Sequence, residues 1–339
     1  MNRSEHIFAQ YVRILGRGKR GSRSLNREEA FSAMRMILND EVEPVQLGAF
    51  LMLLRVKEES PEELAGFVDA ARASLPQVPS CAPNNIDLDW SSYAGKRRQL
   101  PWFILAALLL AENGTTVLMH GTAGQRDNRI YTPEVMRRFG IADCESLEVA
   151  VEQIKSNNIA FISLEHFSPK LKQIMALRNL LGLRSPINTL LRILNPLGAP
   201  HLMQGTFHPG YRPIHQQAAL HLKQAHMAVF KGEGGECERN PDSDCEVFSV
   251  HHGDASEERW PAIFKTRHLK DESMDANRLL QVWHGEADDE YGVAAVIGTT
   301  AIALRMMSRA ATPEAAMDQA KAMWEKRNRA QYPRSPMEP

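Results

Sequence analysis

Basic side chains cluster in this sequence in a way that suits the binding of phosphate groups. Residues 166–232 contain no Asp or Glu over 67 positions, although they hold eight Lys or Arg residues. Further basic runs cover residues 13–27, residues 326–334 and the triplet at 96–98. Lys and Arg neutralise phosphate charge, and a glycine-interleaved basic loop such as residues 17–23 adds backbone N–H groups. The candidate nucleic-acid-binding residues are Arg13, Arg17, Lys19, Arg20, Arg23, Lys96, Arg97, Arg98, Lys170, Lys172, Arg178, Arg184 and Arg192.

The charges are segregated rather than unbalanced. The 339 residues include 40 Lys and Arg against 41 Asp and Glu, so the net charge of −1 gives no overall attraction to nucleic acid or membrane. Acidic residues concentrate in residues 233–258 and 271–290. Such blocks predict one basic face and one acidic face. Each basic run could equally be an ordinary solvated helix face, and residues 17–23 a plain connection between helices.

Three other groupings could carry chemistry. Cys237 and Cys245, followed by His251 and His252, could bind zinc, but their spacing fits no standard finger and acids surround them. An exposed acidic loop without a metal is therefore favoured. Five histidines between residues 201 and 226 could line one face, although ordinary packed positions are the commoner role. Aromatic residues flank the basic triplet and could stack on unpaired bases or pack at a domain boundary; they are Trp90, Tyr93 and Trp102.

The elements that must position these residues follow from local patterns. Capping signals at Asn26 and Ser60 predict helices within residues 26–75, and the apolar stretch 103–112 predicts another. Short apolar runs at 115–119, 159–163 and 227–230 are typical of buried strands between helices. They indicate an α/β fold with a largely parallel sheet. Residues 78–95, rich in Pro, Asn and Ser, are typical of a linker.

The composition also indicates a compartment. Four scattered cysteines without a CxxC pair are typical of a soluble protein of the reducing cytoplasm. The first twenty residues lack an apolar core, so we expect no signal peptide. The apolar run 103–111 is about half the ~20 residues needed to span a bilayer, so we expect no membrane partner.

Two longer stretches resemble the anthranilate phosphoribosyltransferase family. Residues 25–73 are similar to its helical N-terminal domain, and residues 161–210 carry its motifs in the same order and spacing. These motifs are Arg178-x-x-x-Gly182-x-Arg184, Asn195-Pro196 and Gly205-x-Phe207-His208-Pro209. The resemblance implies a helical domain of residues 1–75, to which residues 165–195 return, and an α/β domain of residues 76–164 and 196–339. It also implies a homodimer joined through the helical domain.

The family's transfer of phosphoribose needs three devices, and the resemblance places each on altered residues. A glycine-rich turn binds diphosphate through backbone N–H groups, a Lys-His-Gly-Asn segment holds the sugar phosphate, and an Asp-Glu pair holds magnesium. The metal pair falls on Cys237 and Glu238, next to Glu236, so the two glutamates are only weak metal candidates. Tyr93 is expected to obstruct the turn. The degraded phosphoribosyl-diphosphate site comprises Ser91, Ser92, Tyr93, Ala94, Gly95, Met119, His120, Gly121 and Thr122.

This pattern is similar to the YbiB-like branch of the family, which lacks the transferase motifs and is associated with nucleic-acid binding. The resulting hypothesis is a cytoplasmic homodimer without a catalytic residue or cofactor. It would bind DNA or RNA, single- or double-stranded, through the phosphate backbone and without sequence preference. A second hypothesis is a divergent glycosyltransferase or phosphorylase that uses phosphoribosyl diphosphate and Mg with Glu236, Glu238 and Arg178. A third is a protein-binding module that uses the acidic residues 233–290.

Overall fold

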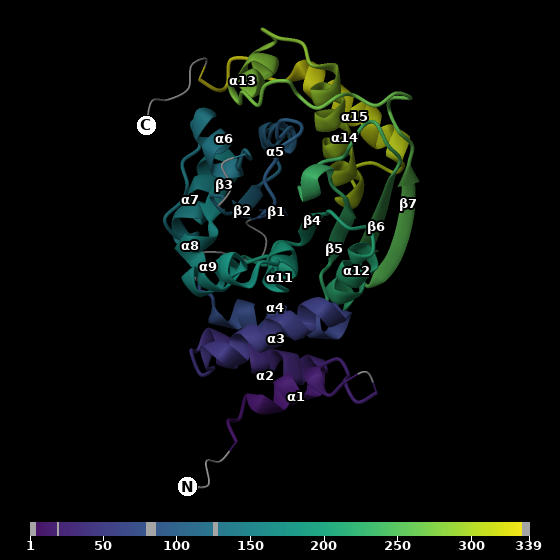
Figure 1. Ribbon diagram of the computed structural model, residues 1–339. Helices are drawn as coiled ribbons and strands as arrows, with labels where there is room; N and C mark the ends of the chain where they lie inside the picture. Colours follow the sequence, from purple (N-terminus) through teal and green to yellow (C-terminus); the bar gives the residue numbers. More distant parts are fainter. Residues whose placement is uncertain (1–4, 19, 79–85, 125–127, 334–339) are drawn as a thin grey trace.

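The N-terminal part of the chain is a small group of helices. The computed structural model describes residues 5–18, 20–78, 86–124 and 128–333 (Figure 1). The first helices are α1 (Ala9–Gly16), α2 (Arg27–Leu38), α3 (Pro44–Lys57) and α4 (Pro61–Ser74). The predicted caps are present: Asn26 begins α2 and Ser60 begins α4, each with a complete capping box. Satisfying the first backbone N–H groups in this way fixes where both helices begin.

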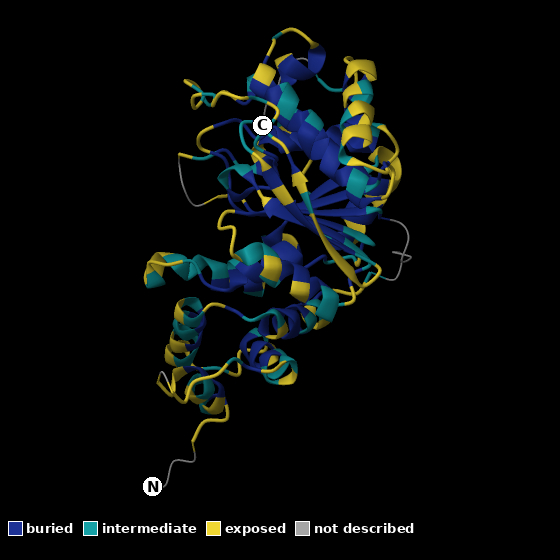
Figure 2. Ribbon diagram, turned by 90° about the vertical axis from the view of Figure 1, so that its right-hand side faces the viewer, coloured by how far each residue is buried: buried dark blue, intermediate teal, exposed yellow. Residues whose placement is uncertain are grey.

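The described residues after the helical part are built on one seven-stranded sheet. Its strands are β1 (Leu88–Ser92), β2 (Val117–Gly121), β3 (Ile159–Ser163), β4 (His201–Thr206), β5 (His226–Lys231), β6 (Cys245–His251) and β7 (Asp254–Trp260). They lie in the order β3-β2-β1-β4-β5-β6-β7. The first five strands are parallel, whereas β6 and β7 form an antiparallel hairpin at one edge. In Figure 2 β7 is the largely exposed strand at that edge.

Strand order places a crevice at the centre of the sheet. From β1 the chain moves outward through β2 to β3, then returns to place β4 on the other side of β1. The β1/β4 pair is therefore the topological switch point, where the loops that follow the two strands diverge. In open α/β sheets ligands bind at the carboxyl ends of the strands at this point.

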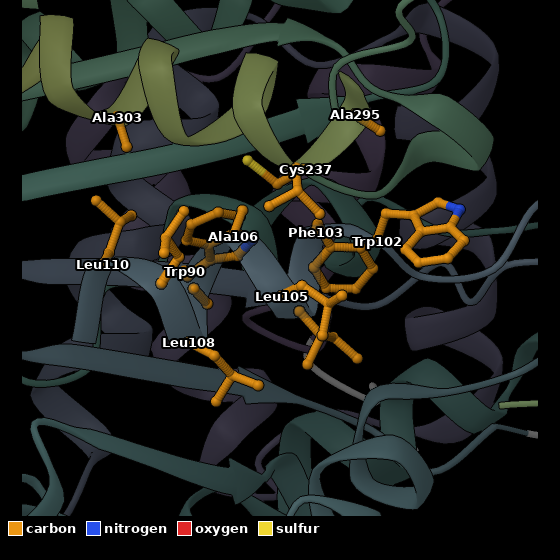
Figure 3. Packing of buried hydrophobic residues seen from close by; sticks show 14 of the residues in the cluster. Trp90, Trp102, Phe103, Leu105, Ala106, Leu108, Leu110, Cys237, Ala295 and Ala303 are labelled. Atoms are coloured by element: carbon orange, nitrogen blue, oxygen red, sulfur yellow. The ribbon is translucent and has the colours of Figure 1, made fainter. Parts of the chain in front are cut away.

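Helices cover both faces of the sheet. The later helices are α5 (Phe103–Glu112), α6 (Thr132–Arg138), α7 (Leu147–Asn157), α8 (Leu164–Phe167), α9 (Pro169–Ala176), α10 (Arg178–Leu181), α11 (Ile187–Ile193), α12 (Tyr211–His221), α13 (Asn277–His284), α14 (Glu290–Met306) and α15 (Pro313–Lys326), with a 3-10 turn η1 (Glu233–Gly235). Helices α5, α13, α14 and α15 share a core with one face, around Trp90 and Phe103 (Figure 3). Helices α7, α11 and α12 share the second core with the N-terminal helices. Strand residues alternate between the cores, as the two-residue period of a strand requires.

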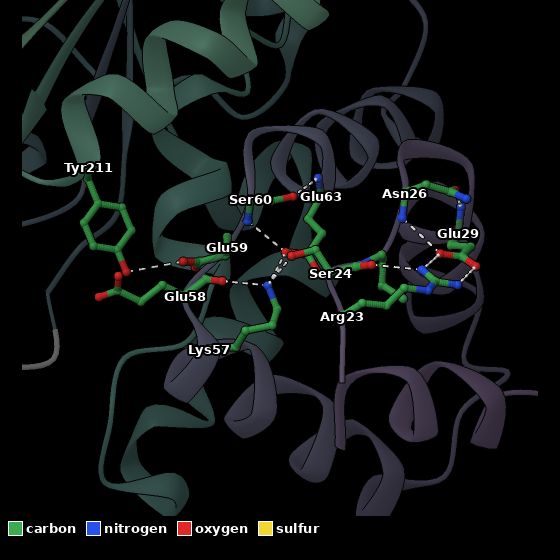
Figure 4. A network of polar contacts seen from close by, with 11 residues as sticks. Arg23, Ser24, Asn26, Glu29, Lys57, Glu58, Glu59, Ser60, Glu63 and Tyr211 are labelled. Atoms are coloured by element: carbon green, nitrogen blue, oxygen red, sulfur yellow. Dashed lines mark hydrogen bonds and ion pairs between the residues drawn. The ribbon is translucent and has the colours of Figure 1, made fainter. Parts of the chain in front are cut away.

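The two parts of the chain are joined by polar contacts as well as by the second core. Within the helical part, Glu63, at the start of α4, accepts hydrogen bonds from the backbone N–H of Leu25 (2.8 Å) and from the Lys57 ammonium (2.7 Å) (Figure 4), whereas the next two contacts cross to the rest of the chain. Arg72 of α4 donates to the carbonyl of Leu194 beyond α11 (2.7 Å). Tyr211 of α12 donates to Glu59 (3.3 Å). The contacts of Arg72 and Glu59 therefore link the helical part to the end of α11 and to α12.

The predicted α/β class is confirmed, and two local interpretations are wrong. The strands expected at 159–163 and 227–230 are β3 and β5, and the helix expected at 103–112 is α5. Residues 78–95 are not a plain linker, because they contain β1, an interior strand of the sheet, although residues 79–85 lie outside the described residues. The expected exposed acidic loop is instead a buried segment that leads into the β6–β7 hairpin. Within the described residues, no helix combines the length and apolar character that crossing a membrane requires.

Candidate functional site

A basic cleft opens at the carboxyl ends of the central strands. Its volume is about 560 Å³, and its walls come from the segments after β1, β5 and α9. Its lining residues include Lys96, Arg97, Arg98, Arg129, Arg178, Arg184, Phe207, His208, Lys231, Asn240, Ser243 and Arg267. Among the described residues that line it, two are acidic, Glu233 and Asp244. The strongly positive wall favours an anionic ligand.

Backbone pairing directs the basic triplet toward this cleft. Lys96 exchanges two backbone hydrogen bonds with Ile130, and the carbonyl of Arg98 accepts from the N–H of Asp271 (2.7 Å). The side chains of Arg97 and Arg98 are exposed and line the cleft. The triplet is thus held in place by its backbone, as the preorganised part of an anion site must be.

The structure brings together only part of the predicted basic set. Arg97, Arg98, Arg178 and Arg184 line the cleft as expected of an anion site. The residues of the predicted set that are described but do not line it are Arg13, Arg17, Arg20, Arg23, Lys170, Lys172 and Arg192. Lys19 lies outside the described residues. Residues 13–27 belong to the helical end of the molecule, away from the sheet (Figure 1).

Several members of the predicted set are ion-paired within the chain. Arg13 pairs with Glu5, Arg23 with Glu29 at 2.7 Å, and Lys170 with Asp40. Lys172 pairs with Glu165 at 3.1 Å. The absence of acids from residues 166–232 therefore overstated the available charge, because acids from elsewhere in the chain meet these cations.

Arg192 and Lys96 are buried, which corrects their assignment to a nucleic-acid surface. The Arg192 guanidinium donates to the carbonyls of Gly205 and Gly235, at 2.6 Å for the second, and so ties β4 to η1. Burial lowers the pKa of Arg192. The Lys96 side chain is 1% exposed and forms an ion pair with Glu238 inside the core. Neither charge is available to a polyanion at the surface.

The turn after β1 already holds a negative charge. One carboxylate oxygen of Glu236 accepts hydrogen bonds from the backbone N–H groups of Ala94 and Gly95, both at 2.6 Å. Gly95 has φ +68°, a left-handed conformation that turns successive N–H groups to the same side. Glu236 is 1% exposed, and its second oxygen has no hydrogen-bond partner among the described residues. The N–H groups that could bind a ligand phosphate therefore bind a carboxylate of the same chain.

The two candidate metal ligands do not fit a magnesium site. Glu238 is fully buried and accepts from the Lys96 ammonium and from the N–H of Phe103 at the start of α5 (2.9 Å). Burial raises the pKa of Glu238 to about 7, against the opposing effect of Lys96. The described residues contain no group of three or more metal-ligating side chains placed to hold an ion. Magnesium prefers several free oxygens and retained waters, which this pair does not provide.

The rest of the degraded site is a buried polar network. Tyr93 does not obstruct the turn as expected, because its ring points inward and its hydroxyl lies 2.8 Å from Nδ1 of His120. Nε2 of His120 lies 3.1 Å from Asp89, and all three side chains are buried. Ser92 and Thr132 share a hydrogen bond of 2.6 Å. Burial raises the pKa of Tyr93 well above its ordinary value, so its phenol stays neutral.

The aromatic residues proposed for base stacking are in the wrong place. Trp90 and Trp102 are fully buried in the core that covers one face of the sheet. An aromatic side chain that the sequence interpretation did not assign to stacking, Phe207, is 50% exposed. It lines both the basic cleft and a second, adjoining hollow of about 90 Å³. An aromatic residue directly after a strand lies at the edge of the sheet, and this pattern could have indicated the position of Phe207. Strand β4 was not predicted from the sequence, so the pattern was not recognised.

Three basic residues of the cleft were also missed. Lys231 ends β5, and the predicted strand at 227–230 could have placed it at the carboxyl edge. Arg129 donates to the carbonyls of Ala94 (2.8 Å) and Gly95 (2.9 Å), and Arg267 comes from the long segment before α13. Neither arginine stands in a sequence pattern that indicates this position.

Comparison with known proteins agrees with the geometry of the fold. Residues 9–75 match the model of the helical bundle domain of the glycosyl transferase family. The chain is 28% identical over 206 residues to the uncharacterized protein YbiB of Escherichia coli K12, covering 60% of this chain and 64% of that protein. It is 28% identical over 285 residues to an anthranilate phosphoribosyltransferase of Burkholderia cenocepacia, covering 82% of each. The matches to the first curated relatives span 62–64% of their length.

Solved structures show the same fold at low identity. Anthranilate phosphoribosyltransferase from Thermus thermophilus matches with a TM-score of 0.77 and 21% identity over 94% of each chain. The enzyme from Saccharomyces cerevisiae, solved with PRPP and Mg, matches with a TM-score of 0.74 and 17% identity over 95% of this chain and 94% of that one. Residues 9–75 thus match the helical bundle domain of the glycosyl transferase family, and the chain is similar in sequence to anthranilate phosphoribosyltransferases and to YbiB.

Proposed function

We propose that this protein binds a nucleic-acid strand in the basic cleft, through the phosphate backbone and without sequence preference. The observation that carries the proposal is the lining of the cleft. Seven basic residues besides the buried Lys96 meet there, against two acidic ones. Neutralising several successive phosphates requires this many cations along one groove, and one small anion does not.

The state of the turn after β1 supports a polyanion over a small diphosphate. Glu236 holds the N–H groups of Ala94 and Gly95, and Glu238 is neutralised by Lys96. A compact diphosphate would have to displace a buried carboxylate from these N–H groups. A strand can instead use the exposed arginines of the outer cleft without disturbing either contact.

The test is a titration of a labelled short oligonucleotide followed by fluorescence anisotropy, at salt concentrations between about 50 and 200 mM. We expect binding that weakens linearly in log salt. The double variant Arg97→Gln/Arg98→Gln should weaken binding about tenfold or more and reduce the salt slope by about two. The matched control is Arg17→Gln/Arg20→Gln, which removes the same charge from exposed residues outside the cleft. An equal loss in both variants would contradict binding in the cleft.

Phosphoribosyl transfer is the second candidate, and the comparisons support it more directly than nucleic-acid binding. Several relatives are anthranilate phosphoribosyltransferases, and their solved structures share the fold. The residues placed for magnesium do not fit the ion in the observed arrangement, so this reaction needs the segment around Glu236 to move. Thermal unfolding with phosphoribosyl diphosphate and MgCl₂ separates the two functions. A ligand at 100 times its Kd adds about 2.7 kcal/mol, so a clear rise in Tm would favour the transferase.

We also propose a homodimer joined through the helical domain. Helix α3 buries Phe50, Leu51 and Leu54 against its neighbours, yet its other side is apolar too. That outer side is formed by the exposed or half-buried residues Val45, Ala49, Met52 and Val56. Their spacing of four, three and four places them on one helix face, as in helix–helix interfaces. Val45 and Val56 are 78% and 84% exposed, and packing against a second copy of the chain would bury both side chains.

A further inference from the structure

We propose that the 90 Å³ hollow beside the basic cleft binds an unpaired nucleobase, stacked on Phe207, so that the protein prefers single strands to duplexes. The inference rests on the proposed nucleic-acid binding and adds the class of strand and the residue that selects it. It is carried by the position of one exposed aromatic ring and by the uncharged polar side chains that line the hollow beside it, together with three arginines.

Phe207 is held where a base could reach it. It follows β4 directly, at the switch point of the sheet, and half of its side chain is exposed. Its base packs against η1: a Cβ added to Gly235 would lie 3.2 Å from the Cβ of Phe207. The edge of the His208 ring contacts it, with centroids 4.9 Å apart and planes at 87°. A solvent-exposed ring that is fixed at its base offers an open face for stacking at little entropic cost.

The adjoining hollow combines uncharged polar groups with three arginines. Its lining includes Ser185, Asn188 and His215 together with Phe207 and His208, and also Arg55, Arg184 and Arg192. Arg55 donates to the hydroxyl of Tyr211 (3.2 Å), and Arg192 donates to the carbonyl of Gly235 (2.6 Å). Burial lowers the pKa of His215 to about 3, so its ring is neutral at physiological pH. No side-chain hydrogen bond of Asn188 is present among the described residues, and its carboxamide offers both donors and an acceptor. Uncharged donors and acceptors next to an aromatic face suit the edge of a nucleobase, and arginines can donate to base oxygens and nitrogens as well as to phosphate.

The two hollows share part of their lining, as one nucleotide requires. Arg184, Phe207 and His208 line both of them. A base stacked on Phe207 therefore lies next to the cationic wall that would hold its own phosphate and those that follow. In a duplex the bases are paired and stacked within the helix, so they cannot enter the hollow without being unpaired.

The experiment compares three labelled ligands of about 12 nucleotides: a single strand, the same strand with abasic sites, and a duplex. We expect Phe207→Ala to weaken binding of the ordinary single strand by about 5- to 150-fold, the usual range for loss of one base–aromatic stack. Phe207→Trp should restore affinity, while Phe207→Leu, which keeps apolar bulk without an aromatic ring, should not. Abasic and duplex binding should be unchanged in Phe207→Ala, as should the salt slope. Because Phe207 is half-exposed, circular dichroism should show all variants folded.

The outcomes separate this inference from the proposed function. Equal affinity of the wild type and Phe207→Ala for the ordinary single strand, with salt-dependent binding retained, overturns the stacking site and leaves cleft binding standing. Equal affinity of the wild type for ordinary and abasic strands overturns it too. If the wild type binds none of the three ligands even at about 50 mM salt, both proposals are wrong.

Discussion

A single carboxylate decides what the turn after β1 can bind. Glu236 satisfies two backbone N–H groups in the place where such turns usually offer them to an anion, and it does so from within the core. Hydrogen bonds to a charged acceptor contribute about 1.5–3 kcal/mol each, and leaving buried donors unpaired costs a similar amount. The residue therefore acts as an internal anion that stabilises the turn.

This interpretation predicts that Glu236→Ala destabilises the protein by about 2–4 kcal/mol and exposes an anion site. Inorganic pyrophosphate should then raise the Tm of the variant but not that of the wild type, because only the variant has free N–H groups at the turn. Thermal unfolding with and without pyrophosphate measures both effects. Glu246→Ala is the matched control, since Glu246 is an exposed carboxylate paired with Arg212. A pyrophosphate response equal in wild type and Glu236→Ala would refute the role given to Glu236.

At the scale of elements, the local sequence signals were reliable for the starts of helices and for buried apolar strands. The capping boxes at Asn26 and Ser60 and the apolar runs of β3 and β5 depend on neighbouring residues only, so the sequence shows them. Strand β1 was missed because its polar residues, such as Asp89 and Ser91, are buried and find partners from distant segments. The buried acids before β6 were missed for the same reason: Lys96, the partner of Glu238, lies 142 positions away.

The Glu238 contact joins three elements and makes stability depend on pH. Its carboxyl group connects the segment after η1 to Lys96 and to the first N–H of α5. The pKa of Glu238 is about 7, above the ordinary 4.5, so the folded protein retains a proton that the unfolded chain has lost. The contribution of Glu238 is therefore complete below pH ~4.5 and is lost as the pH rises through about 7.

We expect Glu238→Gln to remove this dependence. The free energy of unfolding of the wild type, minus that of the variant, should fall by up to about 3 kcal/mol between pH 4.5 and 7. Urea unfolding across this range measures it. The wild type must be compared with the variant because other groups also titrate in this range. Burial lowers the pKa of His226 to about 4, so the contribution of His226 to the free energy of unfolding changes in the opposite direction. A difference that stays flat or rises with pH would contradict the raised pKa.

At the scale of the whole molecule, the sequence indicated a basic surface but not its location. Arg97, Arg98, Arg178 and Arg184 were recognised, and they come from two segments that the fold brings to one edge of the sheet. Basic residues of the helical domain were included because the sequence alone does not show which runs meet. Phe207 and Arg267 were not included, because their role depends on the strand order. Charge composition predicts the kind of ligand, and topology determines the residues that contact it.

The last prediction concerns assembly. Val45 and Val56 lie at the two ends of the exposed apolar side of α3. A carboxylate at each position would be buried, without a charge partner, against the same helix of the second copy. Val45→Glu/Val56→Glu should therefore convert a dimer of 38.1 kDa chains into a folded monomer. Light scattering coupled to size-exclusion chromatography gives the mass. Val149→Glu, at a valine of α7 that is 49% exposed, is the control and should leave the dimer intact. A monomeric wild type, or a double variant with the mass of a dimer, would remove α3 from the interface.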